Sequence, residues 1–240
     1  MRPSRGRWPA TILVGLTLIA AAAWWVTNTP LFDMRTLRVS GNRHLSDTEV
    51  ARLAGLSRTT NVMWLRTGAL ADRIEQDPWV LRAKVSRTLP GTVTVSIHER
   101  RPVAIVEAGR SSLLVSGDGV ILGSARPKTR LPAITLAGAP VAVGSRISGL
   151  PAVLIVARSL PAGVRSKVAR ITQARPGALT LILRDGAKVL YGDASETDAK
   201  GRALSSLLSW ASKRGIRPDY IDVRAPAAPA LLPLGAVPSS

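Results

Sequence analysis

A long apolar run opens the chain and predicts a helix. The 17 residues ATILVGLTLIAAAAWWV, beginning at Ala10, carry no charge. As a helix they would span about 25 Å, which is near the short limit for crossing a bilayer. Trp8 lies before this run, and Trp24 and Trp25 lie near its end, where amphipathic rings favour the lipid headgroup level. We therefore expect a transmembrane helix over residues 10–27, with these three tryptophans as membrane anchors.

The charges on either side of the run predict its orientation. Residues 1–9 hold three arginines and no acidic residue, and no further Lys or Arg occurs before Arg35. The positive-inside rule then makes residues 1–9 a cytoplasmic tail and puts the bulk of the chain outside the plasma membrane. The alternative is a secretory signal that is cleaved at Ala21-Ala22-Ala23. Two tryptophans directly after these small residues are a poor start for a mature chain, so we expect an uncleaved, single-pass anchor.

Residues 32–99 contain segments with the hydrophobic pattern of a strand and segments with the signals of a helix. Apolar and polar residues alternate up to the turn at Gly41-Asn42, which indicates a strand. Ser46-Asp47-Thr48-Glu49 is a capping box and opens a helix, and a second helix must stop at Asp77-Pro78. Two further alternating runs flank Leu89-Pro90-Gly91 and predict a hairpin. The predicted order is β-α-α-β-β.

Residues 100–224 predict a mostly antiparallel β domain with a flanking helix. Their strongest signal is Asp185-Gly186, a two-residue hairpin turn between two strands. A helix follows with Leu204, Leu207, Leu208 and Ala211 on one face. Tyr220–Arg224 reads as the last strand.

The stretch after this strand differs from the rest of the chain in composition. Residues 225–240 contain four prolines and no charge, which predicts a flexible C-terminal tail with at most a short edge strand.

Together, these patterns predict an α+β fold class. It consists of an N-terminal transmembrane helix, a β-α-α-β-β domain and a mostly antiparallel β domain with a flanking helix.

The net charge of the chain limits its partners. Lys and Arg number 33 and Asp and Glu 15, so the formal charge is +18. This excess fits arginine-rich solvated faces, or attraction to a polyanion such as nucleic acid or an anionic surface. Runs of consecutive basic residues never exceed two, and aromatic residues for base stacking are few. We therefore expect no nucleic acid as a partner.

The reactive side chains argue against an enzyme. The chain has no cysteine, which excludes disulfides, a thiol nucleophile and cysteine-based metal sites. His44 is expected to be a solvated turn residue, and His98 and Glu99 are neighbours on a strand, so they point to opposite faces. Three aspartates adjoin glycine and are expected to form turns: Asp118, Asp185 and Asp193. We expect no catalytic residue, cofactor, metal or small-molecule substrate.

An ordered set of motifs resembles the FtsQ/DivIB family of bacterial cell-division proteins. The resemblance covers about residues 8–226 and implies that residues 32–99 form a POTRA domain and residues 100–224 an FtsQ-type β domain. The motifs that carry it are Phe32–Asn42, Asp77-Pro78-Trp79-Val80, Leu89-Pro90-Gly91-Thr92-Val93, Glu99-Arg100-Arg101-Pro102-Val103-Ala104 and Tyr220–Arg224.

The family resemblance also implies a function. It implies a non-enzymatic scaffold in the plasma membrane at the division septum. Such a scaffold binds FtsB/DivIC-like and FtsL-like division proteins and helps regulate septal peptidoglycan synthesis. In the family the partner adds a strand to the sheet edge formed by the last strands. The residues implied here are Tyr220, Ile221, Asp222, Val223, Arg224, Ala228, Ala230, Leu231 and Leu232. A departure from the family pattern is that Pro226, Pro229 and Pro233 interrupt this stretch.

Two other functions compete with this interpretation. The chain could be another membrane-anchored POTRA protein that acts as a polypeptide-binding or export module. Repeated POTRA units and a long series of barrel strands would be expected there, whereas this sequence shows one unit. A secreted wall- or nucleic-acid-binding module would require signal cleavage, and its binding would weaken steeply with salt.

Overall fold

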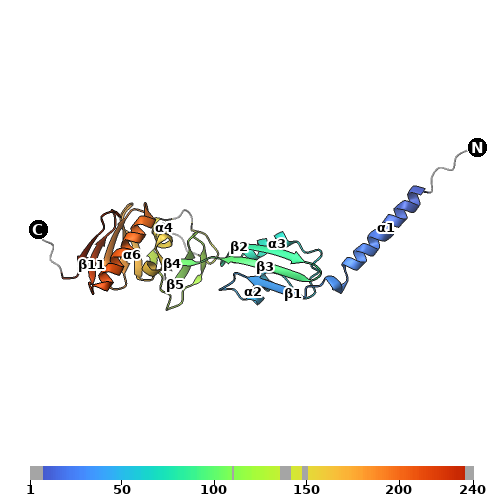
Figure 1. Ribbon diagram of the computed structural model, residues 1–240, viewed down its shortest axis with the longest axis horizontal. Helices are drawn as coiled ribbons and strands as arrows, with labels where there is room; N and C mark the ends of the chain where they lie inside the picture. The colour runs from blue at the N-terminus through green and yellow to red at the C-terminus, as the bar shows by residue number, and fades with distance from the viewer. Residues whose placement is uncertain (1–7, 110, 136–141, 148–150, 236–240) are drawn as a thin grey trace, which may run out of the picture. The chain divides into compact units, whose positions relative to one another are not determined.

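The computed structural model describes residues 8–109, 111–135, 142–147 and 151–235 (Figure 1). The chain divides into two compact units, residues 1–99 and residues 100–240. Each unit has its own cluster of buried apolar side chains.

The N-terminal helix α1 (Trp8–Thr27) covers the segment in which the sequence predicts a helix. It contains no Asp, Glu, Lys or Arg, and its Trp24 and Trp25 side chains are exposed. The side chain of Trp8 lies outside the described residues. Among the described residues, no helix is both long enough and apolar enough to cross a membrane.

The rest of the first unit has the predicted β-α-α-β-β order, which is confirmed. A short 3₁₀ helix, η1 (Pro30–Phe32), precedes it. The three strands of this unit form a sheet in the order β1-β3-β2, in which β1 is parallel and β2 antiparallel to the central β3. The elements are β1 (Thr36–Ser40), α2 (Asp47–Ala54), α3 (Thr67–Glu75), β2 (Val80–Thr88) and β3 (Thr92–Glu99).

Local sequence signals explain where the helices of this unit begin and end. The predicted capping box is present: the Glu49 N–H donates to Ser46 Oγ (3.3 Å), and Glu49 Oε2 accepts from the Ser46 N–H (2.8 Å). Gly55 ends α2 with a φ of 69°, a left-handed conformation that favours glycine. Val50 of α2 and Ile74 of α3 are fully buried against the sheet residues of the same cluster.

The second unit is built on a nine-stranded sheet in the order β12-β11-β10-β9-β8-β7-β4-β5-β6. Parallel pairing occurs between β4 and β7, β7 and β8, and β10 and β11, and the other neighbours are antiparallel. The predicted mostly antiparallel domain is thereby confirmed. The strands are β4 (Pro102–Ala108), β5 (Ser111–Ser116), β6 (Ile121–Ser124), β7 (Ala133–Thr135), β8 (Val168–Gln173), β9 (Leu179–Leu183), β10 (Lys188–Gly192), β11 (Pro218–Asp222) and β12 (Ala230–Pro233).

The helices described alongside this sheet are α4 (Ala152–Ser159), α5 (Ala162–Arg165) and α6 (Thr197–Lys213). The predicted Asp185-Gly186 turn joins β9 to β10, and Gly186 adopts the left-handed φ of 96° that such a turn requires. Leu204 and Leu208 of α6 are buried in the core of the unit. Because α6 connects β10 to β11, these two neighbouring strands run parallel.

The C-terminal stretch contains the short edge strand that the sequence allows. Residues 230–233 form β12, which pairs antiparallel with β11, so this part of residues 225–240 is a strand within the otherwise predicted tail. Leu231 packs against the core, and the prolines lie at the borders of the strand, with Pro229 before it and Pro233 at its end. A proline at the border of an edge strand does not prevent pairing on the inner side.

Candidate partner-binding edge

The residues implied for partner binding on β11 lie inside the sheet. β11 pairs with β10 on one side and with β12 on the other. Ile221 and Val223 are fully buried, whereas Tyr220 and Asp222 are half-buried. Both backbone edges of β11 are therefore occupied, and a partner strand cannot pair with it directly.

The outer edge of the sheet is formed by β12. In the described part of the chain, β12 has β11 as its single neighbour, with Ile221 opposite Leu231 and Tyr220 opposite Leu232. The Leu234 N–H donates to the Arg217 carbonyl, 2.8 Å away. Since backbone groups alternate between the two sides of a strand, the N–H of Leu231 points to the open side.

Proline restricts what this open edge can offer. Pro233 lies two residues after Leu231, so its backbone nitrogen faces the same open side, but it has no N–H. Pro229 precedes the strand. Leu231 is therefore the position within β12 whose N–H can bond to an added strand. Carbonyl groups on the same side remain as acceptors, so the backbone groups that the edge offers are few and fixed in position.

The opposite edge of the same sheet is covered where β6 begins. The Ile121 N–H donates to the Ser145 carbonyl (2.9 Å), and the Gly144 N–H donates to the Ile121 carbonyl (2.8 Å). Val120 also forms an isolated antiparallel bridge with Arg146. Residues 144–147 thus occupy backbone groups of this edge, in contrast to β12.

A charged pair closes the end of β11. Arg224 donates to both carboxylate oxygens of Asp222, with the shortest distance, Nη2 to Oδ2, at 2.6 Å. These hydrogen bonds lower the pKa of Asp222 and raise that of Arg224. A shallow hollow of about 380 Å³ lies beside the pair, lined by Asp222, Arg224, Ala225, Ala228 and Ala230. Four of the implied partner residues thus line one hollow next to the open edge.

A buried lysine, which the sequence analysis missed, fixes α6 behind these strands. Lys200 is only 3% exposed, and its Nζ donates to Asp193 Oδ1 (2.7 Å) and to the Asp193 carbonyl (3.2 Å). Asp193 also accepts from the Ser195 N–H, as predicted for a turn residue. Burial raises the pKa of Tyr191 to about 12, and its hydroxyl donates to the Thr197 carbonyl. A lysine within an otherwise polar stretch carries no signal of burial in the sequence.

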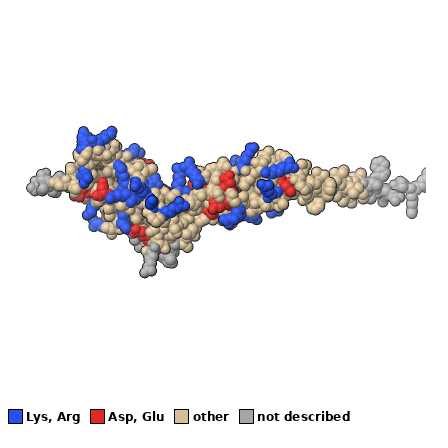
Figure 2. Space-filling view, turned by 90° about the horizontal axis from the view of Figure 1, so that it is seen from below, with Lys and Arg blue, Asp and Glu red and all other residues tan. Residues whose placement is uncertain are grey.

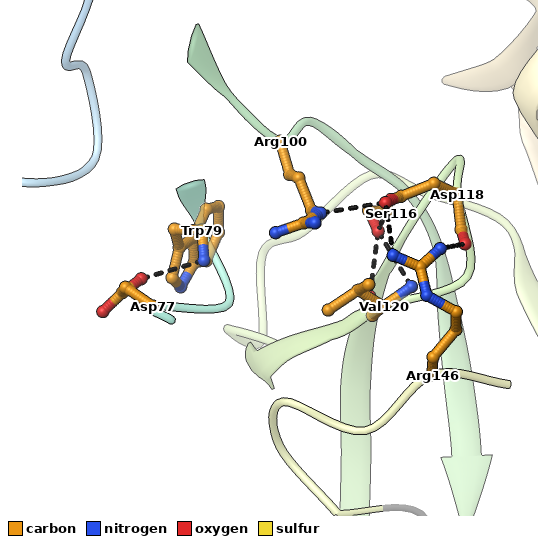
Figure 3. Close-up of polar contacts among 7 residues, drawn as sticks. All are labelled: Asp77, Trp79, Arg100, Ser116, Asp118, Val120 and Arg146. Carbon is orange, nitrogen blue, oxygen red and sulfur yellow. Dashed lines mark hydrogen bonds and ion pairs between the residues drawn. The ribbon is translucent and has the colours of Figure 1, made fainter. Parts of the chain in front are cut away.

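Asp118 accepts hydrogen bonds from three side chains rather than facing a substrate. Its partners are Ser116 Oγ (2.5 Å), Arg100 Nε (3.0 Å) and Arg146 Nη2 (3.3 Å), as Figure 3 shows. Burial acts to raise the pKa of Asp118, but the hydrogen bonds from Ser116 and Arg100 outweigh it, and the pKa is lowered. Ser116 also bonds the backbone of Val120, so the cluster stabilises the β5–β6 turn.

His44 and Glu99 take part in contacts within the first unit. His44 is exposed as predicted, and its ring also stacks on Trp79, with centroids 3.5 Å apart. The backbone N–H of Trp79 in turn donates to Asp77 Oδ1 (2.9 Å; Figure 3). Glu99 accepts from the backbone N–H groups of His44 and Leu45, which outweigh the effect of burial and lower its pKa. The described residues hold no group of three or more His, Cys, Asp or Glu that could bind a metal ion.

Two family models match the two units. The model described as POTRA domain, FtsQ-type, matches residues 32–100. The model described as Cell division protein FtsQ/DivIB, C-terminal, matches residues 104–224, which is half of the chain. The chain belongs to the FtsQ/DivIB family of cell-division proteins. The part of the first unit after α1 is therefore an FtsQ-type POTRA domain.

Curated relatives carry the name Cell division protein FtsQ. That of Mycobacterium leprae is 31% identical over 181 residues, which are 75% of this chain and 52% of the relative. That of Mycobacteroides abscessus is 29% identical and covers 82% of this chain and 63% of the relative. The chain thus spans between half and two thirds of the length of these FtsQ relatives.

Among solved structures, a DivIB domain is similar to part of this chain. It is the major extracytoplasmic domain of the trans isomer of DivIB from Geobacillus stearothermophilus. The match has 18% identity and a TM-score of 0.33, and it covers 50% of this chain and 98% of that chain. At this score the likeness carries no argument about the fold.

Proposed function

We propose that this FtsQ/DivIB protein is a non-enzymatic scaffold of the division septum. In this proposal α1 spans the plasma membrane with residues 1–9 in the cytoplasm, and both folded units lie outside. The scaffold binds FtsB/DivIC-like and FtsL-like proteins and through them helps regulate septal peptidoglycan synthesis. Membership of a cell-division family supports this role, as do the apolar composition of α1 and the arginines before it.

The open edge of β12 is the observation that carries the proposal. Among the described residues this strand edge has no pairing partner, and it offers the N–H of Leu231 next to a hollow lined by Ala228 and Ala230. Strand addition at such an edge takes its affinity from backbone hydrogen bonds and its register from alternate side chains. The prolines around β12 keep the edge short, which disfavours uncontrolled pairing with other chains.

The test separates the backbone of Leu231 from its side chain. Leu231→Pro removes the N–H of Leu231, whereas the matched control Leu231→Ala removes most of the side chain and keeps the N–H. We expect the full chain in detergent to capture the FtsB/DivIC-like protein of the same bacterium about tenfold less tightly with Leu231→Pro than with Leu231→Ala, a difference of about 1.4 kcal/mol. Equal capture by the two variants would place the partner site elsewhere.

A polypeptide-binding or export role predicts a different result. A general chaperone would capture unrelated extended peptides irrespective of Leu231, through a strand edge of the POTRA sheet. The edge of β2 is less suited to this, because the Ala83 N–H already donates to Glu75 Oε1 (2.8 Å). Unselective capture that survives Leu231→Pro would favour this alternative.

A further inference from the structure

We propose that one end of the POTRA domain docks on the lipid headgroups of the membrane that holds α1. The residues that enter the headgroup layer are Leu31, Trp64 and Leu89, here named the tip cluster. Nearby arginines bind anionic phospholipid headgroups. The inference rests on the proposed membrane anchor and adds a second lipid contact outside it.

Exposure singles out the tip cluster. Outside α1, the described part of the first unit exposes four large apolar side chains: Leu31 (50%), Trp64 (57%), Leu81 (38%) and Leu89 (48%). Leu81 lies at the start of β2, near the opposite end of the sheet, because Val80 pairs with Glu99. The other three belong to segments that converge, so their exposure forms a local feature rather than scattered single residues.

Hydrogen bonds tie these three segments together. The Val62 N–H donates to the Phe32 carbonyl (2.8 Å), which joins the loop of Trp64 to the segment of Leu31. The Arg35 N–H donates to the Gly91 carbonyl (2.8 Å), which joins the same segment to the turn that contains Leu89. All three tip residues therefore lie at the end of the sheet where β1 and β3 begin.

Arg87 makes the loop of Trp64 rigid. Its Nη1 donates to the carbonyls of Val62 (3.0 Å), Met63 and Leu65 (3.1 Å). The backbone on both sides of Trp64 is thus held by one guanidinium, while the indole itself remains more than half exposed. A rigidly presented tryptophan with an apolar body and one N–H suits the boundary between lipid and water.

The chain path brings this end next to the anchor. The Thr27 carbonyl, at the end of α1, accepts from Asn61 Nδ2 at 2.7 Å. Leu31 follows four residues later, within about 14 Å of Thr27 even if that segment were fully extended. If α1 spans the bilayer, the tip cluster cannot lie far from its surface.

The tip end of the POTRA domain carries fewer acidic side chains than its other end. Arg35, Arg58 and Arg66 are exposed in or beside the three converging segments, where Asp33 is the acidic residue. The acidic residues at the start of α2 and the end of α3, together with Glu99, lie toward the other end of the sheet. Clustered arginines next to an apolar contact are attracted to anionic lipid headgroups. In the view of Figure 2, α1 shows neither positive nor negative side chains, whereas both colours appear on the folded units.

The absence of cysteine from the chain permits a direct measurement. Single cysteines replace Trp64, Leu81 or Leu16 in the full chain, and each carries a nitroxide label after reconstitution into phosphatidylglycerol vesicles. Collision with oxygen reports lipid immersion, and collision with a water-soluble nickel complex reports exposure to water. We expect the label of Trp64→Cys to be several-fold more accessible to oxygen, relative to nickel, than the label of Leu81→Cys. Leu89→Cys serves as a second tip site and should behave like Trp64→Cys.

The label at Leu16, within α1, separates this inference from the proposed anchor. Labels at positions 64 and 89 that are as accessible to nickel as the label at position 81, with position 16 immersed, would overturn the docking of the tip and leave the anchor standing. A water-exposed label at position 16 would overturn the anchor itself.

A second comparison tests the arginines. In phosphatidylglycerol vesicles, the double substitution Arg58→Gln and Arg66→Gln should reduce immersion of the label at position 64. In purely zwitterionic phosphatidylcholine vesicles, the labelled Trp64→Cys chain with both arginines should lose this immersion. Arg43→Gln, at the other end of the domain, is the matched control and should change neither. Equal immersion in both lipids would overturn the role of the arginines.

Discussion

Asp193 and Lys200 show how a charged residue in this protein stabilises the fold. The hydrogen bond from the buried Lys200 is the largest cause of the lowered pKa of Asp193. Because the pKa of Asp193 in the folded chain lies below its usual value near 3.8, the ionised form stabilises the fold above about pH 4. That contribution is lost as the pH falls further and the carboxylate is protonated.

We therefore predict that Asp193→Asn lowers the thermal unfolding midpoint of the full chain at pH 7, because it leaves the Lys200 ammonium without its carboxylate. The difference from the parent should shrink as the pH falls below about 4, because Asp193 of the unfolded parent is then protonated and must release that proton when the chain folds. Circular dichroism melts of the detergent-solubilised protein from pH 3 to pH 7 measure both effects. Asp219→Asn, at an exposed position of β11, is the control. A constant difference across this range would contradict the assignment.

Residue interactions were predictable from the sequence only where they are local. Asp185 and Asp193 accept from the backbone N–H two residues onward, as expected for turn formers. The stacking of His44 on Trp79 joins residues far apart in the chain, and so does the ion pair between Asp118 and Arg146. The partners in each contact are too far apart in the chain to lie on one helix or strand, so no local sequence pattern indicates these contacts.

At the scale of elements, α2 depends on its cap. We predict that Ser46→Ala destabilises the chain by about 1 kcal/mol, since it removes the acceptor for the Glu49 N–H. The same substitution in the middle of α6, Ser206→Ala, should not destabilise, because alanine has the higher helix propensity and Ser206 is exposed. Urea unfolding of both variants checks the pair. Equal stabilities would show that the cap contributes nothing measurable.

Elements that are specified by a few adjacent residues could be predicted from the sequence, whereas elements that depend on distant parts of the chain could not. The capping box at Ser46 and the turn at Asp185-Gly186 are short, and both elements form where expected. The parallel pairing of β10 with β11 depends on the crossover through α6, and β12 depends on β11 being in place. The prolines beside β12 weighed against a strand, but packing of Leu231 on the core outweighs this local preference.

At the scale of the whole molecule, the two units carry separate cores, so we expect them to act separately. Deletion of residues 32–99 should abolish septal localisation while capture of the FtsB/DivIC-like protein in solution survives. Replacement of residues 1–30 by an unrelated anchor of the same orientation should preserve most function. Fluorescent fusions and pull-down assays measure the two effects. Midcell bands formed without residues 32–99 would leave the POTRA domain as a spacer.

The position of β12 in the chain has a consequence for biosynthesis. Every other strand of its sheet precedes it, and its neighbour β11 is reached only through α6. During synthesis, the rest of the sheet therefore leaves the ribosome before this edge exists. In a chain that stalls, or is clipped, before residue 230, β11 is the outermost strand on this side, and the β12 edge with its Leu231 N–H is absent. If partners pair with β12 as proposed, their recruitment reports that the domain has been synthesised through this strand.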